Sequence, residues 1–138
     1  SAKWWFLVIV IVQMLLFARA FYPFWQMNRL EQSVARHLQD MGPGQLYTFS
    51  MDISLRTYKV PMQVNNLRHD SIDEAEVGNF VLFNERQFGR QWEGQRVMQN
   101  WEQLNKEFHL HPIHNFGQGW QLYELRRLGA KRIRLKKL

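Results

Sequence analysis

The distribution of apolar and polar positions divides the chain into two unequal parts. Between Lys3 and Arg19 the only polar side chain is Gln13, whereas apolar and polar residues are interspersed through most of the remaining chain. A helix without a polar face cannot lie on a solvated protein surface. The pattern therefore predicts a transmembrane anchor over residues 1–25.

The predicted anchor is short, but its ends suit a membrane interface. The 15 residues between Lys3 and Arg19 are fewer than the about 20 that a spanning helix needs, so both charged side chains are expected to extend toward the head groups. Pro23 predicts the end of the helix or a kink in it. Aromatic residues typical of interfaces flank the apolar run: Trp4, Trp5, Phe21, Tyr22, Phe24 and Trp25.

Two other interpretations of this segment stay open. Ala18-Arg19-Ala20 imitates the small-x-small cleavage site of a secretory signal peptide, although an arginine inside that site fits poorly. The other interpretation is a helix that is buried entirely in protein.

Residues 26–128 have the periodicities of a small folded domain, which we call the head. An apolar stripe predicts a helix over 28–41, with Asn28 and Glu31 as a capping box and Gly42 just past its end. Further helical segments are expected at 52–56, 72–77 and 92–108. Strands are expected at 46–50, 60–65, 79–83, 110–116 and 120–125.

The order of these elements indicates an α/β fold with a mixed sheet of about five strands, and an α+β arrangement stays open. The segment 79–83 is apolar on both faces, as in a central strand, and Pro61 favours an edge strand. The helix at 92–108 implies a right-handed crossover between strands that are parallel neighbours. The turn at 117–119 predicts an antiparallel hairpin.

The net charge of +6 is concentrated at the C-terminus. Seven of the 18 basic residues lie in the last 13 positions, and without them 11 basic residues face 12 acidic ones, a balance of −1. A basic tail, residues 129–138 with the two arginines before it, favours anionic lipid head groups or a partner. Nucleic acid is not expected, because no recognition helix or base-stacking motif is present. The basic residues are Arg126, Arg127, Lys131, Arg132, Arg134, Lys136 and Lys137.

Two groups of residues are weak candidates for ligand binding. His109, His111 and His114 suggest a metal site, because residues at i and i+2 share one face of a strand. No carboxylate nearby in the sequence completes such a site, and three polar side chains on an exposed strand is the simpler interpretation. Ligands of α/β sheets bind beyond the carboxyl ends of strands, which makes the residues after the central strand candidates for a small-molecule site: Asn84, Glu85 and Arg86.

Two further groups are expected to be structural. The carboxylates of Asp70, Asp73, Glu74 and Glu76 predict a solvated acidic turn, because a short exposed segment does not shift carboxyl pKa values as catalysis requires. Aromatic residues at helical and strand spacing are expected in the core, although sugar stacking is the alternative. They are Trp92, Trp101, Phe108, Trp120 and Tyr123.

No catalytic residue and no cofactor is predicted. The sequence has no glycine-rich phosphate loop, no nucleophile elbow and no HExxH motif. The lack of cysteine excludes disulfides and thiolate metal ligands.

Several core and turn segments resemble a known family. They are Val34 to Leu38, Leu46 to Phe49, Leu55 to Tyr58 with Val60-Pro61, Phe80 to Glu85, Trp92, Asn100-Trp101, Phe116-Gly117 and Gly119 to Tyr123. In them the chain resembles the C-terminal end of bacterial GT-C glycosyltransferases of the protein-mannosyltransferase and aminoarabinose-transferase type (family 39-like). The resemblance implies a last membrane helix that leads into a small periplasmic α/β domain. Catalytic residues of that family lie in loops between other membrane helices, so none is carried over to this chain.

These observations lead to two main hypotheses. The first is a non-catalytic, single-span accessory subunit of a larger membrane complex, such as a photosynthetic or respiratory assembly, with other membrane subunits as partners of the anchor. The second is a C-terminal fragment or split half of a lipid-linked sugar transferase, and a soluble enzyme is the least favoured hypothesis. Arginines after the anchor would favour a cytoplasmic head by charge alone. We follow the resemblance and expect the bacterial inner membrane with a periplasmic head.

Overall fold

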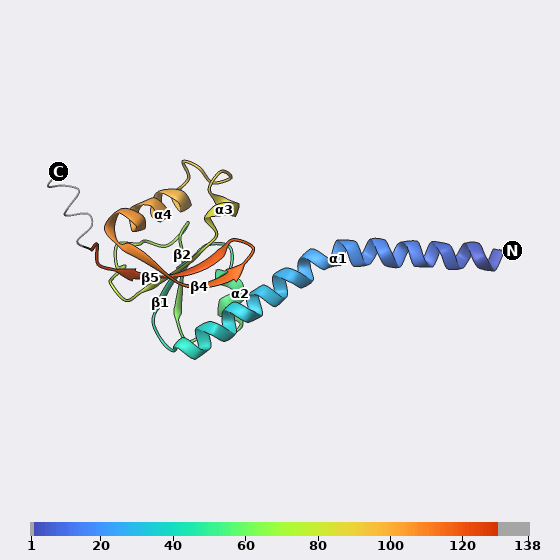
Figure 1. The fold of residues 1–138 in the computed structure, drawn as a ribbon, viewed down its shortest axis with the longest axis horizontal. Coiled ribbons are helices and arrows are strands. Elements are labelled where there is room, and N and C mark those ends of the chain that lie inside the picture. The colour runs from blue at the N-terminus through green and yellow to red at the C-terminus, as the bar shows by residue number, and fades with distance from the viewer. Residues whose placement is uncertain (1, 130–138) are drawn as a thin grey trace.

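The computed structural model describes residues 2–129. One mixed sheet has the strand order β2-β1-β3-β5-β4, in which β1 is parallel to both of its neighbours and β5 is antiparallel to both of its own. This α/β architecture behind one long apolar helix is the predicted fold class (Figure 1). The elements are α1 Ala2–Met41, β1 Gln45–Thr48, α2 Asp52–Thr57, β2 Gln63–Asn66, β3 Phe80–Phe83, α3 Glu85–Phe88, α4 Arg96–Glu107, β4 His109–Gly117 and β5 Trp120–Arg126.

The predicted anchor and the first predicted helix of the head are one element, α1. The helix continues through Pro23 and Asn28 to Met41, so the predicted helix end and the capping box are wrong. Asn28 accepts a hydrogen bond from the Tyr58 hydroxyl instead (3.1 Å). Proline cannot donate to the carbonyl four residues before it, and its ring displaces the preceding turn. Figure 1 shows the resulting change of direction in the light-blue part of α1, so the kink, the other prediction for Pro23, is the one observed.

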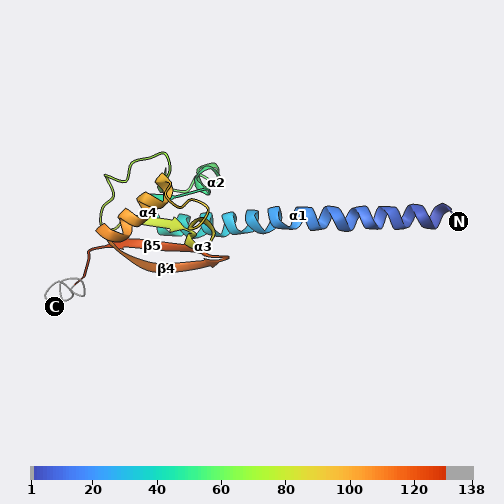
Figure 2. The same cartoon turned by 90° about the horizontal axis from the view of Figure 1, so that it is seen from above.

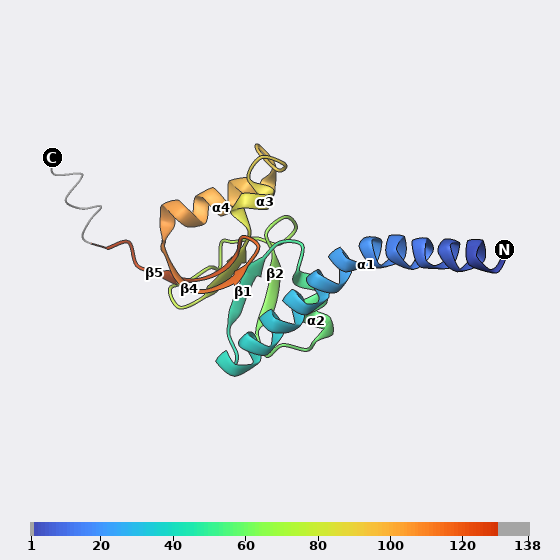
Figure 3. The same ribbon diagram turned by 45° about the vertical axis from the view of Figure 1, so that its right-hand side comes forward.

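Helices α1 and α4 cover opposite faces of the sheet. His37 of α1 stacks on His114 of β4, and Trp101 of α4 stacks on Phe83 of β3. His114 and Phe83 pair with successive residues of β5, and successive strand residues point to opposite faces. The sheet is therefore the middle of three layers, as Figure 3 shows.

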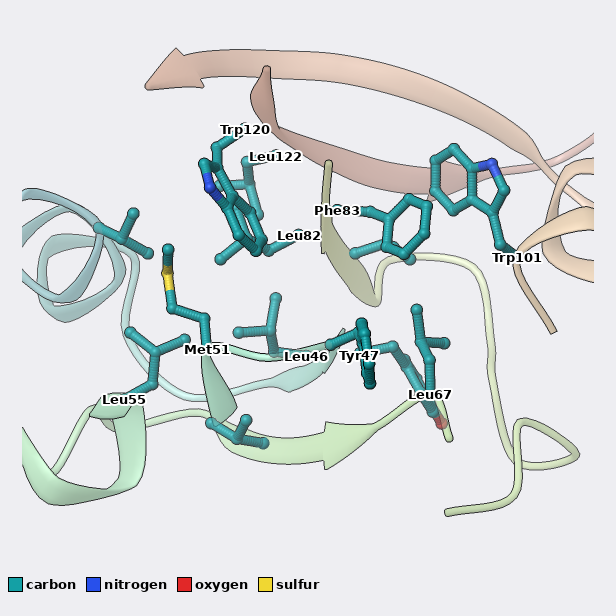
Figure 4. Close-up of a cluster of buried hydrophobic side chains, with 14 of the residues drawn as sticks. Leu46, Tyr47, Met51, Leu55, Leu67, Leu82, Phe83, Trp101, Trp120 and Leu122 are labelled. Atoms are coloured by element: carbon teal, nitrogen blue, oxygen red, sulfur yellow. The ribbon is translucent and has the colours of Figure 1, made fainter. Parts of the chain in front are cut away.

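Each helical layer contributes an apolar stripe to the core. The head part of α1 buries Leu30, Val34, Ala35 and Leu38, and α4 buries Val97, Met98, Trp101 and Leu104. These positions recur at three and four residues, which is the helical period. Figure 4 shows the two sides of this core, with Trp101 beside Phe83 on one side and Trp120, Leu122 and Met51 on the other.

The crossover from β3 to β4 differs from the prediction. The two strands run in the same direction but are not neighbours, because β5 lies between them and is antiparallel to both. The pairing of Leu82 with Leu122 across β3 and β5 buries both side chains completely, which favours this order. The prediction of a central strand at β3 and an edge strand at β2 is confirmed. Figure 2 shows β4 running toward the anchor and β5 returning away from it.

Two short segments were also assigned incorrectly. The predicted helix over 72–77 is a series of turns, in which the Asp73 amide donates to the Ser71 hydroxyl (3.1 Å). Serine side chains that bond to nearby amides favour turns over helix. The predicted helix over 92–108 begins only at Arg96, and the one-turn helix α3 before it was missed.

Candidate functional site

The anchor segment of α1, residues 2–25, is exposed along its whole length. The helix is long and apolar enough to cross a membrane, and none of its most apolar stretch is buried against the head. Because α1 does not end at Pro23, its apolar and aromatic surface continues from Trp4 to Trp25, which is 22 residues. At about 1.5 Å per residue this surface is about 33 Å long and matches a hydrocarbon core of about 30 Å.

Two polar side chains interrupt this surface. Gln13 lies near its middle and Arg19 nearer to the head, and both are exposed. A long arginine side chain reaches an interface from such a position, whereas a glutamine amide at mid-span does not. Trp4, Trp5 and Trp25 lie at the two ends of the surface, where interfacial aromatic residues are expected.

The second half of α1 belongs to the head. Burial begins at Leu30 and continues through Val34 and Leu38, so the predicted boundary between residues 25 and 26 falls inside an unbroken helix. Because no flexible linker separates the two parts of α1, the orientation of the head is coupled to that of the span. Pro23 is the position in this helix that lacks a backbone hydrogen-bond donor.

Asn84, a candidate for small-molecule binding, is committed to the structure of the head. It is the N-cap of α3, where its Oδ1 accepts from the Gln87 amide (3.0 Å). Its Nδ2 donates to the Gln118 carbonyl (3.0 Å), which ties β3 to the turn between β4 and β5. The side chain is buried, and Gly119 packs so closely that a Cβ at that glycine would overlap Asn84. A buried side-chain amide whose oxygen and nitrogen are both hydrogen-bonded within the protein has no free polar group for a ligand.

The other two residues of this candidate group point elsewhere. Glu85 and Arg86 are exposed on α3, and Glu85 lines an open pocket of about 370 Å³ together with residues of α4. Burial and then the Glu85 carboxylate raise the pKa of Tyr123. The structure therefore separates Asn84 from Glu85 and does not bring the three residues together.

Aromatic side chains occupy the carboxyl ends of β1 and β3, where ligands of α/β sheets usually bind. Phe88 packs edge-on against both Phe49 and Trp120, at centroid distances of 5.0 and 5.7 Å. The prediction of core positions is confirmed for Trp101 and Trp120, which are buried. Trp92, Phe108 and Tyr123 are partly buried and pack against that core.

The three histidines of the HLHPIH segment are not arranged as a metal-binding group. A β-bulge between Pro112 and His114 places His114 on the same face of β4 as His109 and His111. His114 nevertheless stacks on His37 (centroids 4.4 Å apart), whereas His109 and His111 lie 6.3 Å apart. Within residues 2–129 no group of three or more histidine, aspartate or glutamate side chains is arranged to hold a metal ion.

His37 was not singled out from the sequence. It lies between buried positions of α1, and its ring also packs edge-on against Phe116 (5.5 Å). Burial lowers the pKa of His37, the neighbouring His114 lowers it further, and Asp40 opposes both effects. The sequence does not distinguish His37 from Arg36 and Gln39, which also flank buried positions of α1 but are exposed.

The acidic residues divide between two environments. Asp70 accepts a hydrogen bond from the Asn66 amide (2.7 Å) and lies 4.0 Å from an arginine nitrogen, Arg56 Nη2. Asp73, Glu74 and Glu76 are exposed and line an open pocket, as a solvated turn would. Its other lining residues, Gln45, Tyr47 and Asn79, were not singled out from the sequence.

The described part of the basic cluster lies at the end of the head away from the anchor segment (Figure 2). Arg126 and Arg127 are exposed, and Arg126 Nε donates to Glu124 Oε1 (3.3 Å). Arg126 is the last residue of β5 and Arg127 follows it, and β5 runs away from the anchor (Figure 2). Contact with head groups therefore stays a prediction without support from these two residues. The remaining predicted contacts lie outside the described residues: Lys131, Arg132, Arg134, Lys136 and Lys137.

The chain matches no protein-family model, no curated protein and no solved structure.

Proposed function

We propose that the chain is a non-catalytic, single-span accessory subunit of a larger membrane complex. The exposed surface from Trp4 to Trp25, continuous with the head, carries this proposal. Such a surface is stable only in lipid or against other membrane helices. The head then has a defined position at the membrane surface, where it can clamp or cap neighbouring subunits.

Gln13 supports protein partners for the span. An amide in the middle of the hydrocarbon layer lacks water, and a hydrogen bond to a neighbouring helix stabilises it by about 0.6 to 2 kcal/mol. The candidate residues of the head support a role without catalysis. Asn84 is used in capping, and His114 is used in the contact between β4 and α1.

Photo-crosslinking from the span tests this function. A benzophenone amino acid at position 13 in native membranes should give a covalent adduct with one defined membrane protein, which should also co-purify at fixed stoichiometry. The same probe at Ile53, exposed on the head, serves as the control for random collisions. The proposal fails if the position-13 probe gives only lipid adducts, or if the full chain stays monomeric and dissolved without detergent.

We also propose the bacterial inner membrane with the head in the periplasm, as the resemblance implies. The chain has no cysteine, so no native cysteine has to be replaced before single-cysteine labelling. Ser71→Cys, at an exposed loop position of the head, should react with an impermeant maleimide in intact spheroplasts, and Ala2→Cys should not. The reverse pattern would place the head in the cytoplasm.

A second candidate is the C-terminal part of a GT-C type lipid-linked sugar transferase. The direct passage of an apolar helix into an α/β domain favours it, because the resemblance implies that arrangement. Co-purification with a polytopic chain whose sugar transfer requires this head would support this function over the first. A partner without such an activity would exclude it.

A further inference from the structure

An open polar pocket lies at the amino ends of the parallel strands β1 and β3. The connection between β2 and β3 forms one wall, held on the α4 side of the sheet by the Asn100 amide, which donates to the Leu67 carbonyl (2.6 Å). The pocket has a volume of about 510 Å³. Its lining residues are Gln45, Tyr47, Asp73, Glu74, Glu76 and Asn79.

The pocket carries negative charge that nothing in the described chain balances. Asp73, Glu74 and Glu76 are exposed, and none of them has an ion-pair partner among residues 2–129. Three carboxylates at one opening attract cations and repel anions.

Tyr47 gives this pocket a feature that a solvated acidic turn lacks. The residue as a whole is only 3% exposed, but its hydroxyl, which has no hydrogen-bond partner within residues 2–129, is not among the fully buried unpaired groups and is accessible from the pocket that Tyr47 lines. A tyrosine hydroxyl in this position can both donate a hydrogen bond to a ligand in the pocket and accept one from it. Burial and then the carboxylates of Glu74 and Glu76 raise the pKa of Tyr47, and all three residues line this pocket.

We propose that this pocket binds a primary ammonium or guanidinium group. The Tyr47 hydroxyl accepts a hydrogen bond from the cation, and Glu74 and Glu76 neutralise its charge. A bound metal ion is the weaker alternative, because these carboxylates are not arranged as a metal-ligand group. An extended organic cation suits the open shape of the pocket, since it does not require its ligands to converge on one point.

Two sources can supply the ammonium or guanidinium group. One is a separate ligand, such as a polyamine or a basic peptide segment of a partner. The other is residues 130–138 of this chain, which carry five basic residues. Their attachment point is close, because the Leu125 amide donates to the carbonyl of Asn79, a lining residue (2.8 Å).

Calorimetric titration of the full chain in a zwitterionic detergent with spermidine, at low salt, tests the proposal. A second protein with the five tail residues changed to glutamine removes the internal source. We expect E74Q/E76Q in this background to weaken spermidine binding about tenfold or more, and Y47F to weaken it several-fold. E93Q/E102Q removes the same charge from exposed positions of the head outside this pocket and should change the affinity less than about twofold.

The outcomes separate the two sources. Binding by both the wild type and the tail variant supports a separate ligand, whereas binding only after the tail is neutralised supports the tail as the occupant. The proposal is overturned if neither protein binds, if E93Q/E102Q weakens binding as much as E74Q/E76Q, or if Y47F binds like its parent. Thermal unfolding of each variant shows that the head is intact, so that a loss of binding reports on the pocket.

Discussion

The two halves of α1 share one helical backbone but occupy different surroundings. Residues 2–25 expose every side chain, whereas residues 26–41 bury Leu30, Val34 and Leu38 and expose polar side chains between them. The first half is apolar on all sides except at Lys3, Gln13 and Arg19, and the second is apolar along one stripe. The arrangement of apolar positions, more than their number, therefore decides whether a helix suits a lipid environment or packs one face against its own domain.

The largest difference between the halves should appear when one leucine in each is shortened. Leu38→Ala removes a fully buried side chain and should destabilise the head by about 2–5 kcal/mol, because a cavity remains. Leu15→Ala, at a position 66% exposed, should leave head stability unchanged. Chemical unfolding of both variants in detergent, followed by tryptophan fluorescence, measures the difference. Equal destabilisation would show that the anchor segment also packs against the head.

The contact of α1 with β4 should make head stability depend on pH. The pKa of His37 is lowered from its ordinary value of 6.5, so the unfolded chain takes up this proton at a higher pH than the folded chain does. Stability is then greatest above pH 6.5 and falls as the pH drops below that value. His37→Gln should flatten the decline, whereas His69→Gln, at an exposed turn, should not. Midpoints of thermal unfolding between pH 7.5 and 5 would measure both slopes.

A smaller gain in stability is expected beneath the head half of α1. Thr48 lies on the sheet face that α1 covers, and its buried hydroxyl has no hydrogen-bond partner among the described residues. Thr48→Val keeps the shape and removes the unsatisfied group, so it should stabilise the head by about 1 kcal/mol. Val64→Thr, at another buried strand position, is the opposite change and should destabilise. No gain in Thr48→Val would indicate that water satisfies the hydroxyl.

The joint between the halves should affect geometry more than stability. Pro23→Ala restores a backbone donor and should reduce the bend, while the free energy of unfolding of the head changes by less than about 0.5 kcal/mol at this exposed site. Spin labels at positions 8 and 32 should show a longer and narrower distance distribution in the variant. An unchanged distribution would mean that packing of the head, not Pro23, bends the helix.

Sequence reasoning identified most elements but assigned their junctions incorrectly. The apolar run of the anchor, the stripe at 28–41 and the five strands have strong local periodicity, and each is present. Pro23 and Asn28 imitate helix boundaries locally, but the same helix continues across both, and the Asn28 side chain bonds to Tyr58 of the head instead of capping.

Asn84 and the HLHPIH histidines show the same limit for function. Their residue types suggested ligands, but the side chains are committed to partners far along the chain. Asn84 contacts Gln118, and His114 contacts His37. Tyr47 carried no sequence signal at all, because alternation on a strand does not reveal whether a tyrosine hydroxyl has a partner.

The amino-acid order alone determined that the chain contains a helix suited to lipid and continues into a small α/β head, because both follow from periods of a few residues. Only the tertiary structure decided that these two parts share one helix, that β5 separates β3 from β4, and that an acidic pocket forms over Tyr47. Each of those outcomes depends on contacts between residues distant in the chain. Local periodicity shows which positions are apolar, but not which distant segments pack together to bury them.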